Sequence, residues 1–328
     1  MKFLIIGSNS FSGSSFVSYL LDREYTVIGV SRSAEEKNIF LKYKKNKNIK
    51  LFSFVKIDIN KDLNKLVELV KKNEPTHIIN FSAQGMVAES WIKPEHWYKT
   101  NLLSQVLLHN ELRKFSFIRK YIHFTTPEVY GSTRGWIKEH TNFSPSTPYA
   151  VSRAACDLHL LSFYKAYDFP VIFTRAANVF GPFQQLYRIV PRTILFSKIN
   201  RKLMLDGGGN SVRSFIHIDD VSTALYKIIK RGLVGNTYHI STNESVSIKK
   251  LVKIICRMTD SNFNDFVDVK EDRLGKDQAY LLNSNKLRTE LNWEDKISLK
   301  DGLFNTMKWI DDNLTSIKKL SFDYKHKV

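Results

Sequence analysis

Short apolar runs alternate with helix-periodic segments over the first half of the chain, and this alternation limits the fold more than any other feature. The runs have the length of strands and lie at 3–6, 26–30, 51–57, 77–82, 121–126 and 170–175. Between them, stretches such as 61–73 and 98–117 repeat apolar residues at intervals of three and four, which is typical of amphipathic helices. The alternation predicts βαβ units and a parallel sheet covered by helices.

Beyond the last of these runs the pattern loosens into loops, short strands and helices. We therefore expect an α/β fold with a Rossmann-like, doubly wound parallel sheet and a smaller, interleaved α/β region that binds the substrate. The expected sheet domain is 1–175, with 214–240 returning to it; the substrate region is 176–213 and 241–313, and 314–328 form a polar tail. Ligands of such open sheets bind beyond the carboxyl ends of the strands.

Composition places the chain among ordinary globular proteins. A hydrophobic content of 43% excludes a disordered or collagen-like chain. Cys156 and Cys256 are too few for a disulfide framework and lack metal-ligand spacing, so we expect a reducing compartment and no metal. The opening MKFLIIG is too short for a signal-peptide core, and no apolar run has the length of a membrane span. These features predict a cytoplasmic protein without a membrane partner.

The formal net charge of +18 raises the question of a nucleic-acid partner. The lysines are spread along the chain, densest at 42–50 and near the end, and are accompanied by many asparagines. This distribution favours a solvated lysine-rich surface over a nucleic-acid footprint. A positive surface also suits a ligand with two phosphates.

The sequence GSNSFSG (7–13) follows the first predicted strand directly and leads into an apolar-periodic segment. Such a turn brings backbone N–H groups and a helix N-terminus to a pyrophosphate; an ordinary tight turn is the alternative. Gly7 and Gly13 allow close approach, whereas Ser10 between them either crowds the phosphates or bonds one. After the second strand, Arg32 is suited to the 2′-phosphate of NADP, although an exposed loop arginine would look the same. We expect NADP, with NAD as the alternative.

Several segments resemble, in the same order, those of the extended short-chain dehydrogenase/reductase family. They are GSNSFSG (7–13), NFSAQGMVAESWIKPEHWYKTN (80–101), FTTPEVYGS (124–132), SPSTPYAVSRAACDLHL (144–160), RAANVFGP (175–182), VRSFIHIDDV (212–221) and DRLGKDQAY (272–280). The resemblance spans nearly the whole chain. Within the family, the sequence is most similar to the nucleotide-sugar 4,6-dehydratases of the dTDP-glucose and GDP-mannose type. The resemblance implies an NAD(P)-dependent lyase, commonly a homodimer, that acts on a nucleotide-diphosphate sugar.

The resemblance also assigns ligand contacts to positions of this sequence. The implied cofactor contacts are Gly7, Asn9, Ser10, Phe11, Gly13, Arg32, Asp58, Ile59, Ser82, Ala83, Gln84, Asn101, Tyr149 and Arg153. The implied substrate contacts are Gln84, Thr126, Glu128, Asn178, Arg188, Arg213 and Arg273. The three arginines of this second set match a diphosphate clamp, and guanidinium groups bind phosphate bidentately.

The implied catalytic residues are Thr126, Glu128, Tyr149 and Arg153. Tyr149 would take the proton of the sugar 4-hydroxyl, which Thr126 binds, while Glu128 would eliminate water across C5 and C6. Two positions depart from the family pattern. Arg153 stands where the family has a lysine, and Pro127 stands where it has an aspartate. We expect Glu128 to serve twice, first as base at C5 and then as acid toward the leaving hydroxyl.

Arg153 lies four residues after Tyr149 and therefore on the same helical face. Lowering the pKa of a tyrosine by about three units requires roughly 4 kcal/mol. One positive charge at about 5 Å supplies about 3 kcal/mol at an effective dielectric constant of about 20, and oxidised nicotinamide adds more. Arginine keeps the charge of lysine, so we expect altered geometry rather than an inactive site.

The expected reaction converts a nucleotide-diphosphate hexose or related sugar to its 4-keto-6-deoxy derivative, by oxidation at C4, elimination of water across C5 and C6, and return of hydride to C6. Within the same fold, a UDP-glucuronate decarboxylase or a C4 epimerase is the alternative, although DRLGKD (272–277) favours the dehydratase. From a different class, the alternative is a non-catalytic member that binds RNA. Pro127, Arg153 and the net charge are its support.

Overall fold

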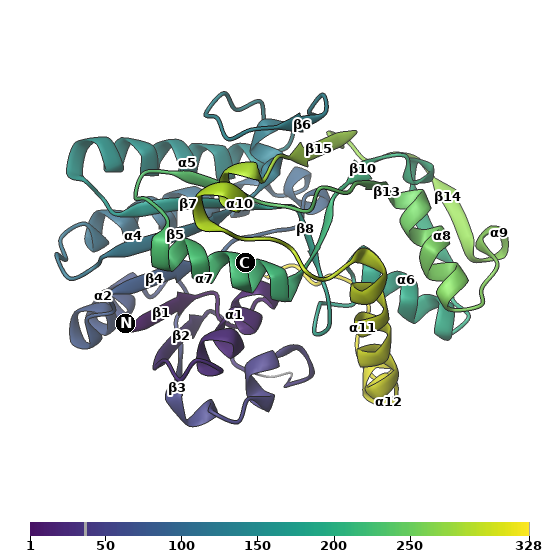
Figure 1. The fold of residues 1–328 in the computed structure, drawn as a ribbon, viewed down its shortest axis with the longest axis horizontal. Coiled ribbons are helices and arrows are strands. Elements are labelled where there is room, and N and C mark those ends of the chain that lie inside the picture. Colours follow the sequence, from purple (N-terminus) through teal and green to yellow (C-terminus); the bar gives the residue numbers. More distant parts are fainter. Residues whose placement is uncertain (36–37, 328) are drawn as a thin grey trace.

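The computed structural model describes residues 1–35 and 38–327, and its centre is a seven-stranded parallel sheet (Figure 1). The strand order is β12-β7-β5-β4-β1-β2-β3, and every neighbouring pair is parallel. Bounds of these strands are β1 (Phe3–Ile6), β2 (Val27–Ser31), β3 (Phe52–Lys56), β4 (His77–Asn80), β5 (Lys120–Thr125), β7 (Val171–Ala176) and β12 (Thr237–Ile240). The direction of winding reverses between β1 and β4, which is where open α/β sheets bind ligands. The predicted fold class is confirmed.

Helices cover both faces of this sheet, because its strands are apolar on both sides. In β1, Phe3 and Ile5 join one hydrophobic cluster, while Leu4 and Ile6 join another on the opposite face. The first face is covered by α1 (Phe11–Leu21) and α7 (Ile218–Arg231), and the second by α2 (Leu63–Asn73), α4 (Ser104–Leu112) and α5 (Pro148–Tyr167). A one-residue slip would exchange the two faces, so this double burial fixes the register.

The smaller region has its own hydrophobic cluster and lies beside the sheet (Figure 1). Its helices are α6 (Ile189–Lys198), α8 (Ile248–Met258), α9 (Phe263–Phe266), α11 (Leu299–Asp312) and α12 (Leu314–Ile317). The strands outside the seven-stranded sheet are β6 (Trp136–Ile137), β8 (Asn178–Phe180), β9 (Leu203–Asp206), β10 (Val212–Arg213), β11 (Phe215–His217), β13 (Val246–Ser247), β14 (Val267–Lys270) and β15 (Ala279–Leu282). The pairing of β10 with β15 sets Arg213 beside Tyr280.

Two further α-helices are α3 (Pro94–Tyr98) before α4 and α10 (Asn285–Leu291) near β12, and short 3-10 and π-helical turns lie between the larger elements. No helix in the described part of the chain is both long and apolar enough to cross a membrane. The segment after α12 does not extend into solvent, because Phe322 packs on Phe196 and Tyr324 on Tyr187. The carboxyl-terminal segment is thus part of the folded body.

Candidate active site

The glycine turn at the end of β1 is held by Ser10, which is the N-cap of α1. Its hydroxyl accepts from the Gly13 N–H at 3.1 Å and donates to the Gly7 carbonyl at 2.7 Å. Gly7 has a φ of +85°, and a Cβ at Gly13 would lie 2.2 Å from the Gly7 carbonyl oxygen. Both glycines are therefore required, and the hydroxyl proton of Ser10 closes the turn instead of pointing to a phosphate.

A cleft of about 590 Å³ opens above this turn, at the carboxyl ends of the strands. Several predicted cofactor residues line it: Gly7, Asn9, Ser10, Arg32, Asp58, Ile59, Ser82 and Ala83. Phe11 and Gly13 lie buried behind the turn. The cleft combines a glycine cradle, the start of a long helix and a basic side chain, a set of groups that fits a dinucleotide.

Asn9 and Asn101 fix the two walls of the cleft. The Asn9 amide donates to the Ser33 carbonyl at 2.9 Å and accepts from the Tyr43 hydroxyl at 2.8 Å, which ties the glycine turn to the loop after β2. Asn101 accepts from the Gln84 N–H at 2.8 Å and donates to the Ser152 hydroxyl at 3.0 Å. Together these two contacts connect the loop after β4, through Asn101, to α5, which is the helix of Tyr149.

Local capping places Tyr149 and Glu128 side by side. Thr147 caps α5 through the Ala150 N–H at 3.1 Å, and Thr126 caps the 3-10 turn Pro127–Tyr130 through the Glu128 N–H at 3.3 Å. Each cap is followed by a proline at the first helical position, where a proline costs no hydrogen bond. Pro127 therefore has a structural function in this chain, because it starts the turn that presents Glu128.

The pKa of Tyr149 reflects the meeting of these groups. Burial and the Glu128 carboxylate raise it, while the Arg153 guanidinium and the Thr126 hydroxyl lower it, and the net pKa is above the ordinary tyrosine value. The predicted effect of Arg153 is present, but it does not outweigh burial in the protein alone. Ionisation of Tyr149 at neutral pH therefore needs a further positive charge in the cleft.

Arg153 is almost completely buried, with 2% of its surface exposed. Its Nη2 donates to the Phe124 carbonyl at 2.5 Å, whereas Nε and Nη1 have no hydrogen-bond partner among the described residues. Unpaired buried donors are uncommon. Both nitrogens are themselves buried, and Arg153 is not among the residues that line the cleft, so in this structure the guanidinium faces the interior beneath α5. Beneath it, Asp157 bonds Arg175 at 2.7 Å and approaches His123 Nε2 at 3.2 Å.

Glu128 has a pKa of about 7, raised mainly by burial and then by the nearby Asp277 carboxylate. Arg213 and Arg188 oppose the rise, as does the Tyr280 hydroxyl, which lies 3.4 Å from Glu128 Oε1 and donates to Asn178 Oδ1 at 3.1 Å. A carboxylate with this pKa exchanges protons readily near neutral pH, as a general acid or base must.

The predicted arginine clamp divides into two parts. Arg188 and Arg213 both act on the Glu128 carboxylate, and the Arg213 guanidinium lies 4.0 Å from the centre of the Tyr280 ring. Arg273 stands apart: it is exposed and forms an ion pair with Asp206 at 2.8 Å. Two of the three predicted arginines thus face the carboxylate in this structure.

Tyr280 and Asp277 are site residues that the sequence did not single out. Both lie in DRLGKDQAY (272–280), from which only Arg273 was selected. Asp277 is buried and accepts from the Ser146 hydroxyl at 2.9 Å, and Tyr280 is 8% exposed. The β10–β15 pairing brings them to Glu128, and no spacing within the sequence indicates that register.

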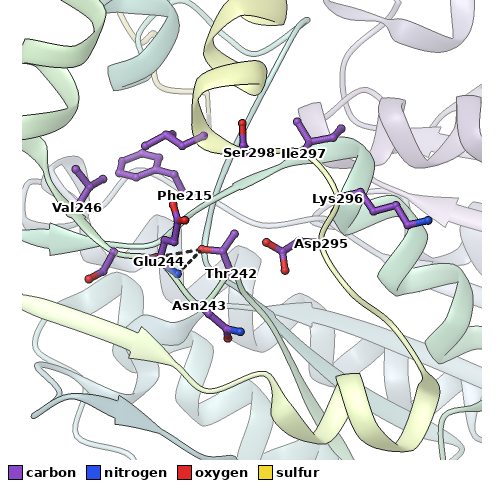
Figure 2. Close-up of a pocket in the computed structure, with 11 residues that line it drawn as sticks. Phe215, Thr242, Asn243, Glu244, Val246, Asp295, Lys296, Ile297 and Ser298 are labelled. Atoms are coloured by element: carbon purple, nitrogen blue, oxygen red, sulfur yellow. Dashed lines mark hydrogen bonds between the residues drawn. The ribbon is translucent and has the colours of Figure 1, made fainter.

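A second cavity of about 320 Å³ lies near β11 and β13 and is shown in Figure 2. Thr242, Glu244, Asp295 and Ser298 are among its lining residues, and the Thr242 hydroxyl bonds the Glu244 backbone within one turn of its wall. It contains none of the predicted site residues. Over residues 1–35 and 38–327, no group of three or more His, Cys, Asp or Glu side chains could hold a metal ion.

The strand order, the glycine turn after β1 and a Tyr-x-x-x-Arg helix beside Thr126 define an extended short-chain dehydrogenase/reductase. A family model described as GDP-mannose 4,6 dehydratase matches residues 4–306, and the chain belongs to this family. The predicted family of nucleotide-sugar 4,6-dehydratases is confirmed.

Individual relatives agree along nearly the whole chain. A probable dTDP-glucose 4,6-dehydratase of Sinorhizobium fredii is 27% identical over 329 residues, covering 95% of this chain and 93% of the relative. The solved dTDP-glucose 4,6-dehydratase of Streptomyces venezuelae, with NAD bound, has a TM-score of 0.89 at 27% identity and covers 96% of this chain and 98% of its own. A solved UDP-glucose 4-epimerase of Thermotoga maritima has a TM-score of 0.87 at 25% identity and covers 96% and 100%.

Proposed function

We propose that this protein is a nucleotide-sugar 4,6-dehydratase that converts a nucleotide-diphosphate hexose to its 4-keto-6-deoxy derivative. The observation that carries the proposal is Glu128, a carboxylate with a pKa of about 7 beside Tyr149 and Thr126. An epimerase does not eliminate water and therefore needs no second acid-base group. A dehydratase needs such a group for the elimination. The dehydratase relatives of similar length support the same choice.

In the proposed reaction, Tyr149 takes the proton of the sugar 4-hydroxyl while Thr126 holds that oxygen. The nicotinamide cofactor, when bound, would supply the reversible hydride carrier: it would hold the hydride from C4 and give it back at C6 once water has left, while a proton, equivalent to the one taken from O4, returns to C5. Glu128 then removes the C5 proton, which the new C4 ketone makes acidic. The same proton passes from Glu128 to the leaving C6 hydroxyl, so one water departs and the carboxylate is restored.

This double use of Glu128 accounts for the proline at position 127. A group that takes a proton and then returns it works best with a pKa near the working pH, and about 7 meets this condition. The single hydroxyl proton of Tyr280 is shared between Glu128 Oε1 at 3.4 Å and Asn178 Oδ1 at 3.1 Å, so Tyr280 would help to orient the carboxylate during both transfers.

We further propose NADP as the cofactor, because Arg32 stands at the end of β2 with its guanidinium over the cleft. NAD is the alternative, since the Streptomyces venezuelae relative was solved with NAD. Arg153 would act through its positive charge near Tyr149, because its unpaired nitrogens are buried. We also propose a cytoplasmic homodimeric lyase, with the domain division 1–175 and 214–240 against 176–213 and 241–313.

The test is incubation of the purified protein with dTDP-, UDP-, GDP- and CDP-sugars, followed by mass spectrometry. Loss of one water from one donor would establish the dehydratase and identify its nucleotide. Loss of carbon dioxide would instead indicate the decarboxylase, and a new isomer of unchanged mass the epimerase. Salt-sensitive RNA binding without any turnover would favour the non-catalytic alternative.

A further inference from the structure

The segment after α12 runs over the mouth of the cofactor cleft. Its residues Ser321, Asp323, Tyr324, Lys325 and Lys327 line the cleft together with the glycine turn and the ends of β2 and β4. We propose that residues 321–327 are a lid that belongs to the cofactor site and slows the release of the cofactor. The inference rests on the proposed use of a nicotinamide cofactor.

Lys327 connects the two walls of the cleft. Its carbonyl accepts from Gln84 Nε2 at 2.5 Å and from Arg32 Nη1 at 3.1 Å. Its ammonium group donates to the Ser33 hydroxyl at 3.1 Å. Gln84 follows β4 and Arg32 follows β2, on either side of the glycine turn after β1. The backbone at Lys327 therefore spans the position that a dinucleotide must enter or leave.

His326 anchors the lid on α3. Its ring stacks on Trp97 with centroids 5.0 Å apart and an interplanar angle of 8°, and on His96 at 5.0 Å and 3°. A hydrogen bond of 2.8 Å joins His96 Nδ1 and His326 Nε2. Trp97 is fully buried, so this end of the lid rests on a fixed surface.

The other end of the lid is attached to the substrate region. Asp323 forms an ion pair with Arg192 of α6 at 2.5 Å, and the Tyr324 ring lies edge-on to Tyr187 with centroids 5.3 Å apart. Tyr187 directly precedes Arg188 of the predicted diphosphate clamp. The lid thus joins the substrate region to the loops of the sheet domain, across the cleft between them.

The open space beneath the lid shows that the segment covers the cofactor cleft and does not fill it. About 590 Å³ remains open between the lid and the glycine turn, so the segment lines the cleft without filling it. Ser321, Asp323, Lys325 and Lys327 are exposed, and Phe322, Tyr324 and His326 are only partly buried, so the segment can detach without unfolding a core. Slow release of the cofactor is useful here, because the proposed reaction regenerates the cofactor in every cycle.

The experiment measures cofactor release. The full chain and a variant lacking residues 321–328 are loaded with NADPH, and its displacement by excess NADP is followed by nicotinamide fluorescence; NADH and NAD form a parallel set. We expect the truncation to accelerate release about tenfold or more, because it removes several hydrogen bonds and the ring stack. His326→Ala should accelerate release to a smaller extent. Lys319→Ala, an exposed change outside the lid, is the matched control and should release at the rate of the full chain.

Thermal unfolding of each variant verifies that the fold is retained, and His326→Ala keeps the test decisive if the truncation does not fold. Equal release rates in the full chain and both lid variants would overturn the proposal. Slower release or tighter binding after truncation would also overturn it, because the segment would then compete with the cofactor. If neither nucleotide binds any of the proteins, the proposed function fails together with the lid. Binding with unchanged release rejects the lid alone.

Discussion

Replacement of Tyr280 by phenylalanine should move the pH dependence of the reaction to higher pH. The Tyr280 hydroxyl lies 3.4 Å from Glu128 Oε1 and lowers the pKa of that carboxyl, which is about 7 in the intact site. A hydrogen bond to a charged group stabilises that group by about 1.5 kcal/mol, and the long distance lowers the contribution of this bond to about 1 kcal/mol. One pKa unit corresponds to about 1.4 kcal/mol, so loss of the Tyr280 hydroxyl should raise the pKa of Glu128 by a little less than one unit.

The measurement is the pH profile of kcat/KM for dehydration, which reports groups of the free enzyme. Glu128 must be ionised to remove the C5 proton, so activity appears as pH rises through its pKa. In Tyr280→Phe the midpoint of the acid limb should move to higher pH. At pH values below this midpoint the activity should fall by up to about fivefold, and on the alkaline side it should stay nearly unchanged. Tyr226→Phe is the control and should leave the midpoint in place, because among residues 1–35 and 38–327 the Tyr226 hydroxyl bonds only Tyr25, at 3.0 Å. An unchanged midpoint, or one that falls, would refute the assigned contact between Tyr280 and Glu128.

Three further changes examine the remaining groups. Glu128→Gln should lower dehydration by at least about a hundredfold while reduction of the bound cofactor by substrate remains visible in the nicotinamide absorbance; surviving elimination would remove Glu128 from its role. Arg153→Met should reduce kcat by about a hundredfold and raise the pH at which Tyr149 ionises, since it deletes the charge that lowers this pKa, whereas Arg153→Lys should retain more activity; equal rates in both variants would contradict this. Arg32→Ala should raise the KM for NADP about tenfold and leave that for NAD nearly unchanged, and an equal effect on both would reject a 2′-phosphate contact.

The sheet could be predicted because its strands bury both faces. Continuous apolar runs such as FLII admit few alternatives once helices separate them, and the burial of Leu4 and Phe3 on opposite faces follows directly. The glycine turn was likewise indicated by a short local motif, whereas Thr126, Glu128 and Tyr149 were indicated by the resemblance of local segments to the family.

Contacts between distant segments could not be predicted. The position of Tyr280 beside Arg213 depends on strand register, and the ion pair of Arg273 with Asp206 depends on how two loops meet. The lid has no apolar periodicity, so its sequence resembles that of a solvated tail. Its position follows from scattered partners, such as Trp97 and Tyr187, that no spacing rule connects.

The buried charges under α5 explain how arginine can occupy position 153. Arg153 and Arg175 contribute two positive charges, Asp157 contributes one negative charge, and burial lowers the pKa of His123 so that it stays neutral at pH 7. The net charge of this group is therefore about +1, close beneath Tyr149. Removal of Arg153 would leave Asp157 and Arg175 balanced, with no net charge to favour the phenolate. The charge at position 153 is thus more important than its exact shape, provided that the Phe124 carbonyl holds the guanidinium in place.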